Sequence, residues 1–200
     1  MQVLLETERL VLRRFTAADA EKLFDLDSDP EVMRFLSGGT PTPRDVIQND
    51  ILPRFLRYDE RFPGYGFWAA IEKATGDFLG WFSFRPSEGA PDEVRLGFRL
   101  RRAAWGKGYA TEGSRALIRK GFTELGAQRV VATTYQDNLA SRRVLEKVGM
   151  TLVRSFRLTP EDLVGTGTYS VSSPDLWDGD DLECALERAD WARQESAGAR

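Results

Sequence analysis

The sequence predicts a single domain of the α+β (mixed α/β) class over residues 1–200. Three observations lead to this prediction. A length of 200 residues is typical of one domain. The apolar pattern has a period of two through the middle of the chain and a helical period before and after it. The first predicted strands form a hairpin and the later ones alternate with helices, which is the order of a mixed sheet flanked by helices.

The N-terminal part is predicted to hold one strand and several helices. Residues 9–15 alternate between apolar and basic side chains, as a half-buried strand does. Apolar positions at helical spacing follow over 17–29, and Pro30 occupies a favoured start position for the next helix. A longer helical stretch covers 43–62. Pro53 is expected to kink or split it, because proline lacks the N–H that a helix interior uses.

The middle of the chain is predicted to form a hairpin and a third strand. Residues 65–73 and 78–86 alternate with a period of two and are joined by a short turn that contains glycine. A third strand covers 93–100. A long amphipathic helix is then expected over 107–125.

The last part alternates between strands and helices. Residues 129–135 are apolar and β-branched, which favours a strand. A helix is expected over 137–150, with Gly149 as its stop. A strand over 151–158 follows, and 180–194 fit a terminal strand that runs into a tail.

Two segments lack periodicity. Residues 159–180 are rich in Gly, Ser, Thr and Pro, and loops of that length are usually functional or mobile. The tail over 193–200 is expected to be mobile as well.

Composition limits the class of protein. The chain is 42% apolar and 30% charged, as ordinary globular proteins are. Cys184 is the only cysteine, so no internal disulfide forms, which suits a reducing compartment, and we expect it in the core of the last strand. No stretch approaches ~18 consecutive apolar residues. We expect a cytoplasmic protein that does not bind membranes.

Charge is unevenly distributed. The chain carries a net −3, yet the window from Arg99 to Lys147 holds 11 Lys or Arg against 4 Asp or Glu. A basic segment in an acidic protein indicates an anionic ligand rather than nucleic acid. Several of these residues also fit solvated helix faces.

Two glycines stand where the helix over 107–125 must begin. Gly106 and Gly108 flank Lys107, between a strand that ends at Leu100 and the helix. The first N–H groups of a helix lack internal partners, and glycine lets a phosphate approach them. The phosphate-loop pattern of nucleotide hydrolases does not fit this spacing. The dinucleotide-binding pattern fails too, because Thr111 stands where its third glycine belongs.

The segment WGKGYATE resembles the pyrophosphate loop of the GNAT acetyltransferase superfamily, whose pattern is Q/R-x-x-G-x-G/A. Trp105 takes the Q/R position, as is common in the RimJ/RimL-like branch, and Gly108 and Ala110 take the last two. Three further stretches resemble segments of that branch: the helical DNLASRRVLEKVGM, the opening TERLVLRRFTAADAEKLF and the hairpin GFWAAIEKATGDFLGW. The resemblance implies a GNAT-like fold: a central, mostly antiparallel sheet with a splayed parallel strand pair, flanked by helices.

The resemblance also implies a binding site for acetyl-CoA. The pantetheine arm is expected between strands 93–100 and 129–135, and the diphosphate on the amides that begin the helix. No metal is implied. The cofactor-binding residues expected are Phe98, Leu100, Arg101, Arg102, Trp105, Gly106, Lys107, Gly108, Tyr109, Ala110, Thr111, Asn138, Ser141 and Arg142, with Arg143 as an alternative for the 3′-phosphate.

The reaction expected is direct transfer of the acetyl group from the thioester to an amine. The chain has no histidine, so another group must accept the proton. Arg95 stands where the branch often has a glutamate. Glu93, two residues earlier, and Glu112 are the candidate bases, although Glu112 also fits a carboxylate that complements the helix N-terminus. Ser141 is expected near the thioester sulfur.

Several alternatives stay open. Asn138 and Ser141 also fit a helix cap and its neighbour. Arg95 can instead bind an acidic group of the substrate. The acceptor is a protein N-terminus or a small-molecule amine, and the chain is a monomer or a homodimer. A second reading is an acyl-CoA sensor without turnover, and a third is a nucleotide-binding protein.

Overall fold

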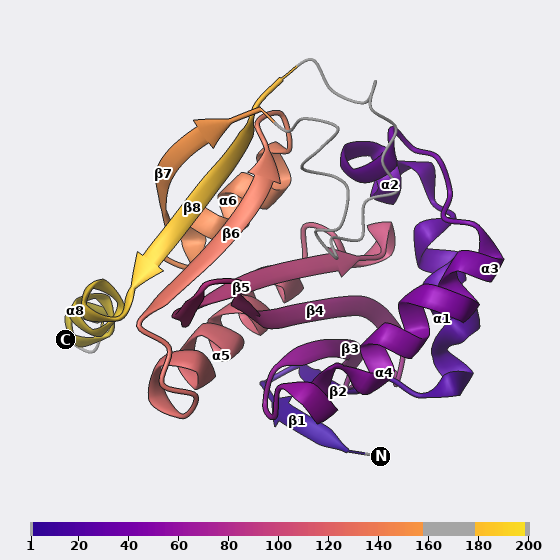
Figure 1. The fold of residues 1–200 in the computed structure, drawn as a ribbon, viewed down its shortest axis with the longest axis horizontal. Helices are drawn as coiled ribbons and strands as arrows, with labels where there is room; N and C mark the ends of the chain where they lie inside the picture. The colour runs from indigo at the N-terminus through magenta and orange to yellow at the C-terminus, as the bar shows by residue number, and fades with distance from the viewer. Residues whose placement is uncertain (1, 158–178, 199–200) are drawn as a thin grey trace.

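The structure, a computed structural model, describes residues 2–157 and 179–198. An eight-stranded sheet runs through the molecule in the order β1-β2-β3-β4-β5-β6-β8-β7 (Figure 1). All neighbouring strands are antiparallel except β5 and β6, which are parallel. The strands are β1 Val3–Glu6, β2 Leu10–Arg14, β3 Gly66–Glu72, β4 Phe78–Ser87, β5 Ala90–Leu100, β6 Arg129–Tyr135, β7 Thr151–Phe156 and β8 Asp181–Glu187.

Helices cover both faces of the sheet. The N-terminal helices α1 to α4 lie on one face, and α5 and α6 lie on the other (Figure 1). The helices are α1 Ala20–Asp27, α2 Pro30–Ser37, α3 Arg44–Val46, α4 Leu52–Arg61, α5 Tyr109–Thr123, α6 Leu139–Lys147 and α8 Arg188–Gly198; short turns of other helix types are Ala17–Asp19, Ile47–Ile51 and Arg102–Ala104. None of the helices within the described ranges is long and apolar enough to cross a membrane.

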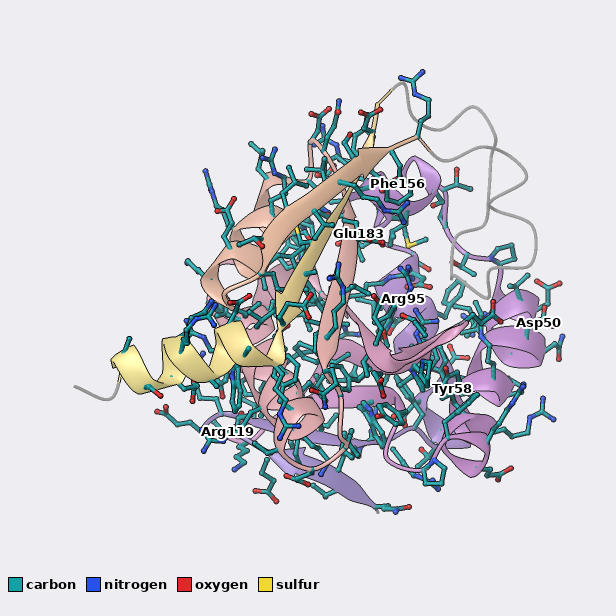
Figure 2. The ribbon with its side chains drawn as sticks, turned by 60° about the vertical axis from the view of Figure 1, so that its left-hand side comes forward. Asp50, Tyr58, Arg95, Arg119, Phe156 and Glu183 are labelled. Atoms are coloured by element: carbon teal, nitrogen blue, oxygen red, sulfur yellow. The ribbon has the colours of Figure 1, made fainter. Side chains whose placement is uncertain are left out.

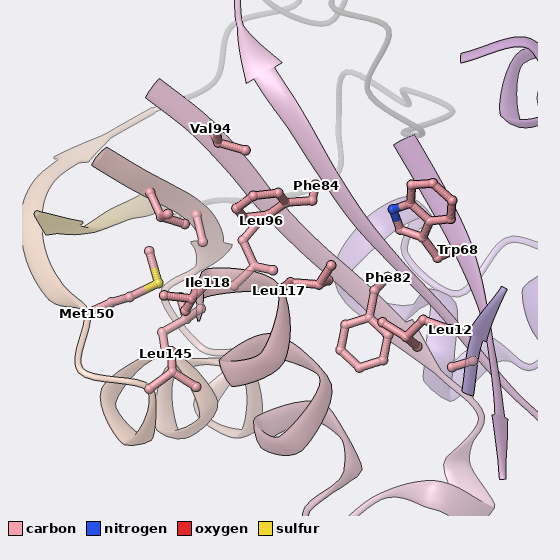
Figure 3. Close-up of a cluster of buried hydrophobic side chains, with 14 of the residues drawn as sticks. Leu12, Trp68, Phe82, Phe84, Val94, Leu96, Leu117, Ile118, Leu145 and Met150 are labelled. Carbon is pink, nitrogen blue, oxygen red and sulfur yellow. The ribbon is translucent and has the colours of Figure 1, made fainter. Parts of the chain in front are cut away.

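Two glycines let α5 lie close to the sheet. A Cβ added to Gly113 would meet the ring of Phe82 at 2.3 Å, and one added to Gly121 would meet Phe84 at 2.5 Å. The two glycines are eight residues apart, so they stand on the same helix face. Leu117 lies between them in sequence and packs into the same core, which Figure 3 shows as a layer between α5 and the strands. This close contact fixes where α5 begins.

A second core holds the N-terminal helices to the opposite face. Phe55 of α4 stacks on Phe67 of β3, with ring centroids 3.8 Å apart. Arg99 of β5 donates to Asp27 of α1 at 2.6 Å, and both side chains are at most 4% exposed. Breaking a buried pair of this kind costs about 3–5 kcal/mol, so the pair ties α1 to the centre of the sheet.

The predicted architecture is confirmed. The hairpin, the third strand, the long helix and the mixed sheet all occur near their predicted bounds, and the parallel pair is the one expected. Cys184 is buried on β8, also as predicted, and burial raises the pKa of its thiol. Pro53 lies in the first turn of α4, directly after a π-helical turn over Ile47–Ile51. The helical run from Arg44 to Arg61 is not interrupted, so the irregularity expected at Pro53 takes the form of a π-helical turn rather than a split.

Two predictions differ from the structure. The strand β1 was not expected, because its four residues are too short to show a period. The expected tail after the last strand is wrong in part, since Arg188–Gly198 form α8. The ring of Trp191 packs 5.3 Å from that of Phe122, and this contact holds the helix on the domain. The predicted loop over 159–180 lies almost wholly outside the described residues.

Candidate functional site

The two parallel strands are hydrogen-bonded over only part of their length. The ladder between β5 and β6 comprises three residue pairs and ends at Arg95 and Val131. Beyond that pair β5 continues to Leu100 and β6 to Tyr135, and the strands diverge (Figure 1). We call the space between residues 96–100 and 132–135 the strand gap.

Backbone groups of β5 are directed into the strand gap. Arg101 N–H donates to the Leu79 carbonyl at 2.8 Å, and the Asp92 carbonyl accepts from Gln128 N–H at 2.9 Å. Hydrogen bonding alternates along a strand, so odd-numbered residues of β5 bond β4 and even-numbered ones face β6. The backbone groups of Phe98 and Leu100 therefore point into the gap. The Leu100 carbonyl accepts from the Trp105 indole at 2.8 Å, which joins the exposed indole to the end of the strand.

The glycine loop begins a helix without capping it. Gly106 and Gly108 have φ values of 72° and 86°, in the left-handed region that favours glycine. Gly108 is the N-cap of α5 and has no side chain to bond the first turn. The N–H groups of Tyr109, Ala110 and Thr111 consequently have no intrahelical acceptor. Three donors at the positive end of a helix dipole form a binding site for an anion.

Arg9 contacts the glycine loop through Lys107 and Tyr109. Its Nη1 donates to the Lys107 carbonyl at 2.9 Å, and its guanidinium lies 4.5 Å from the centre of the Tyr109 ring. The Tyr109 hydroxyl donates to Glu72, and this bond raises the pKa of Tyr109. Arg9 and Glu72 were not expected from the sequence. Arg9 directly precedes β2 and Glu72 ends β3, so nothing near the loop in sequence indicated them.

Glu112 is bonded to the same arginine, Arg9, and to Thr7. Its carboxylate accepts from the Thr7 hydroxyl at 2.5 Å, from Arg9 N–H at 2.8 Å and from Arg9 Nε at 2.7 Å. Burial alone would raise the pKa of Glu112, but these bonds outweigh it and lower the pKa below its usual range. A carboxylate with a lowered pKa is a weak proton acceptor. The geometry therefore favours the alternative considered for Glu112, a role at the helix N-terminus.

The expected phosphate-binding arginines lie in different surroundings. Arg101 and Arg102 face the α1–α2 region, where they lie 3.5 Å from Asp25 and 3.6 Å from Asp29. Arg142 Nη1 donates to the Gln136 carbonyl at 3.0 Å. Lys107 is exposed in the glycine loop itself. Of the basic residues expected to bind phosphate, Lys107 is the one that lies within the glycine loop.

The start of α6 lies at the open end of the strand gap. β6 ends at Tyr135, and α6 begins at Leu139 after one turn. The Asn138 side chain accepts from Ser141 N–H at 3.1 Å, so Asn138 is the N-cap, as one of the two interpretations held. Parallel strands bring the helices that follow them to the same edge of the sheet, so the starts of α5 and α6 both adjoin the gap.

Arg95 and Glu93 lie on the sheet face that carries α1 to α4. They share this face with Arg99 because side chains alternate along β5. Glu93 lies 3.1 Å from Arg129 Nε, at the closed end of the strand pair. Glu93 and Ser141 are thus at opposite ends of β6. Arg95 Nη2 lies 3.6 Å from Glu183 on β8, and Figure 2 shows the two side chains near each other.

The same face bears a carboxylate that sequence reasoning missed. Asp181 pairs with Tyr135 in the ladder between β6 and β8, at the open end of the gap. Burial, and then the charge of Asp180, raises the pKa of Asp181. The Tyr135 ring stacks on Phe35 of α2, with centroids 5.9 Å apart. Asp181 directly follows residues 159–180, whose sequence has no periodicity, so no pattern singled it out.

The family model "Acetyltransferase (GNAT) domain" matches residues 9–151, which is most of the chain. The chain belongs to the GNAT acetyltransferase family. Its relatives include the FsC-acetyl coenzyme A-N(2)-transacetylase of Aspergillus fumigatus, 31% identical over 97% of this chain and 80% of that protein. Another is the uncharacterized protein YkkB of Bacillus subtilis, 34% identical over 76% of this chain and 88% of that protein.

Solved structures agree on the GNAT fold. A GNAT-family acetyltransferase from Bacillus anthracis superposes with a TM-score of 0.72 at 23% identity, covering 94% of this chain and 99% of the other. The microcin C7 self-immunity acetyltransferase MccE, solved with acetyl-CoA and AMP, gives a TM-score of 0.71 at 16% identity, covering 90% and 93%. The expected fold and the assignment as an acetyltransferase are confirmed.

The anchor beneath the glycine loop predicts a pH-dependent stability. Glu112→Gln should lower the free energy of unfolding at pH 7 by about 1–2 kcal/mol, because it removes charge-assisted bonds to Arg9. The folded-state pKa of Glu112 is lowered. The difference from the native sequence should therefore be present above about pH 4.3 and shrink as the pH falls further. Urea unfolding between pH 7 and pH 3.5 measures it.

The matched control is Glu124→Gln, near the other end of α5, where the carboxylate is 60% exposed. It should change the free energy of unfolding by less than about 0.5 kcal/mol at every pH. A Glu112→Gln effect that is no larger than this control would show that Glu112 does not anchor the loop.

Proposed function

We propose that this GNAT acetyltransferase transfers acetyl directly from acetyl-CoA to a primary amine. The observation that carries the proposal is the strand gap with the glycine loop at its open end. An extended amide chain fits the backbone groups of Phe98, and a diphosphate fits the N–H groups that begin α5. GNAT enzymes use acetyl-CoA, and the residues present fit that molecule.

The cofactor contacts follow from this placement. Phe98 would bond the pantetheine amides, and Leu100 would contribute its N–H, since its carbonyl already accepts from Trp105. The amides from Gly106 to Thr111 would hold the diphosphate. We propose Lys107 and Arg143 for the 3′-phosphate, because Arg101 and Arg102 are paired with carboxylates of α1 and α2.

The acceptor is proposed to be an amine of a small molecule. The fungal relative is named an FsC-acetyl coenzyme A-N(2)-transacetylase, and it matches 97% of this chain. The loop and helix-start motifs support placement in the RimJ/RimL-like branch. That branch commonly has a tryptophan at the position of Trp105. A protein N-terminus stays the second acceptor class.

The chain's own residues would divide the chemistry. The amine attacks the thioester carbonyl, its nitrogen forms a bond to the acetyl carbon, and the carbon–sulfur bond breaks. Ser141, at the open end of the gap, would donate its hydroxyl proton to the leaving thiolate and take up a proton from solvent in return. The amine attacks in its neutral form, so the proton that its nitrogen loses when the new bond forms must go to a base, and the chain has no histidine.

We propose that the base is a carboxylate on the α1–α4 face. Glu93 remains a candidate, but it pairs with Arg129 at the closed end of the strand pair. Asp181 lies at the end of β6 from which α6 and Ser141 follow, and its raised pKa suits proton acceptance at neutral pH better. We therefore favour Asp181 as the base, with Glu93 second. Glu112 is the weakest of the three candidates.

A charge in the glycine loop should abolish cofactor binding. Gly106→Glu places a carboxylate among the N–H groups proposed for the diphosphate, and should raise the acetyl-CoA Kd about a hundredfold or more. Isothermal titration calorimetry with acetyl-CoA, CoA and ATP measures it.

The matched control is Gly126→Glu, at the opposite end of α5. Gly106 and Gly126 have φ values of 72° and 76°, and neither has an atom within 4 Å of an added Cβ. Backbone strain and net charge therefore change equally, and only the position differs. Equal acetyl-CoA affinity in both variants, or binding of ATP alone, would contradict the proposed site.

Kinetics separate the proposed acid from the proposed base. Ser141→Ala should lower kcat more than it raises the KM for acetyl-CoA, because the thiolate is made only as the bond breaks. Asp181→Asn should lower kcat/KM by about 10²–10⁴ and remove the acidic limb of its pH profile. Steady-state rates with an amine panel, read as released CoA thiol, measure both.

An unchanged kcat in Ser141→Ala would exclude that role. A lost acidic limb in Glu93→Gln, with Asp181→Asn normal, would move the base to Glu93. The sensor alternative, which Arg95 in place of a glutamate favours, predicts tight acetyl-CoA binding with no transfer to any amine.

A further inference from the structure

We propose that Arg85 and Arg95 form an anion subsite for the acceptor, so that the substrate amine also carries a carboxylate or phosphate group. The inference rests on the proposed function, because it concerns the acceptor side of the same site. It extends that function by naming a second charged group on the substrate.

The two arginines are direct neighbours across the sheet. Arg85 of β4 and Arg95 of β5 are partners in the antiparallel ladder, so their side chains leave the same face. That face carries α1 to α4. Arg95 is also the last residue of β5 paired with β6, so the arginines stand at the closed end of the strand gap. Figure 2 shows Arg95 between Glu183 and Tyr58.

Arg85 has a guanidinium that no carboxylate neutralises among the side chains that the structure describes. Within residues 2–157 and 179–198, no carboxylate forms an ion pair with it, and its Nε is buried without a hydrogen-bond partner. Its guanidinium lies 5.1 Å from the centre of the Phe67 ring. Burial first, and then the charges of Arg54 and Arg95, lower the pKa of Arg85, while Tyr58 opposes them.

Arg95 retains capacity for a ligand. Its nearest carboxylate, Glu183, is 3.6 Å away, beyond hydrogen-bond distance. Both oxygens of Glu183 accept instead from Arg154, at 3.1 Å each. The Arg95 side chain is 39% exposed. Its donors are thus directed to solvent beside the gap rather than saturated by the fold.

Two like charges side by side in a sheet are unfavourable unless something compensates them. Glu183, 3.6 Å from Arg95, and the Phe67 ring beside Arg85 compensate the pair only in part, whereas an oxyanion would offset the repulsion and accept from the buried donor. Guanidinium groups bind carboxylates and phosphates through paired N–H bonds. At the closed end of the gap, such an anion would orient the acceptor so that its amine faces the thioester.

The test compares acceptors that differ only in the anion. The pairs are amino acids with their carboxamides, and O-phosphoethanolamine with ethanolamine. The native enzyme should prefer one anionic member by tenfold or more in kcat/KM. Arg85→Gln and Arg95→Gln should each reduce that preference at least tenfold, with acetyl-CoA affinity unchanged. Which pair shows the preference distinguishes a carboxylate from a phosphate.

A binding measurement decides the matter independently of turnover. Inorganic phosphate, titrated at constant ionic strength into CoA-saturated protein, should raise the Tm of the native chain but not that of Arg85→Gln. The matched control is Arg119→Gln, whose side chain is 68% exposed on α5 and distant from the gap (Figure 2). It should respond to phosphate as the native chain does.

The subsite is contradicted if phosphate leaves the native Tm unchanged, if all three proteins respond equally, or if neutral acceptors are preferred. If the native chain does not bind acetyl-CoA, the proposed function is contradicted instead. In that case phosphate is titrated into the CoA-free protein, and the dependence on Arg85 still tests the subsite.

Discussion

The end of the hydrogen-bonded ladder between β5 and β6 is the constraint on which the rest of the structure depends. Backbone N–H and C=O groups inside a sheet need partners, and leaving them without any is costly. Here the ladder stops at Arg95 and Val131, while β5 carries on to Leu100. Among the described residues, the backbone groups of Phe98 and the Leu100 N–H thereby stay outside the strand ladders, where a ligand with amides of its own can pair with them as a third strand would.

Packing on both faces of the sheet fixes the position of β5 and of the helix start beside the gap. On one face, Gly113 and Gly121 let α5 settle against Phe82 and Phe84, which sets the direction of the helix and therefore of its first N–H groups. On the other face, the buried pair of Arg99 and Asp27 ties α1 to β5. The glycine loop is held in place, because Arg9, just before β2, donates to the Lys107 carbonyl and Glu72 of β3 accepts from the Tyr109 hydroxyl. The anion site is thus formed before any ligand binds, which lowers the cost of ordering on binding.

Much of this could be predicted from the sequence, because it depends on local pattern. The period change after residue 62, the short hairpin turn and the strand–glycine–helix order are all readable within ten or twenty residues. The glycines at 106 and 108 indicated an open helix start that an anion can approach. Such features need no knowledge of what lies across the fold.

What the sequence could not supply are contacts between distant segments. Glu112 looked like a possible base until Arg9, 103 residues away, was found bonded to it. The neighbourhood of Arg85 and Arg95 depends on strand register, which the alternation of side chains alone does not set. Asp181 acquires its environment only when β8 inserts beside β6. Local pattern therefore led to the proposed cofactor side of the site, and tertiary structure led to the proposed acceptor side.

Amide hydrogen exchange at two neighbouring residues tests the central claim most directly. The Phe98 N–H points into the gap, whereas the Arg99 N–H is directed to β4. If the gap receives the pantetheine arm, acetyl-CoA should slow exchange at Phe98 severalfold more than at Arg99, as measured by NMR. Equal changes at both amides, or protection of neither while acetyl-CoA binds elsewhere, would contradict the account.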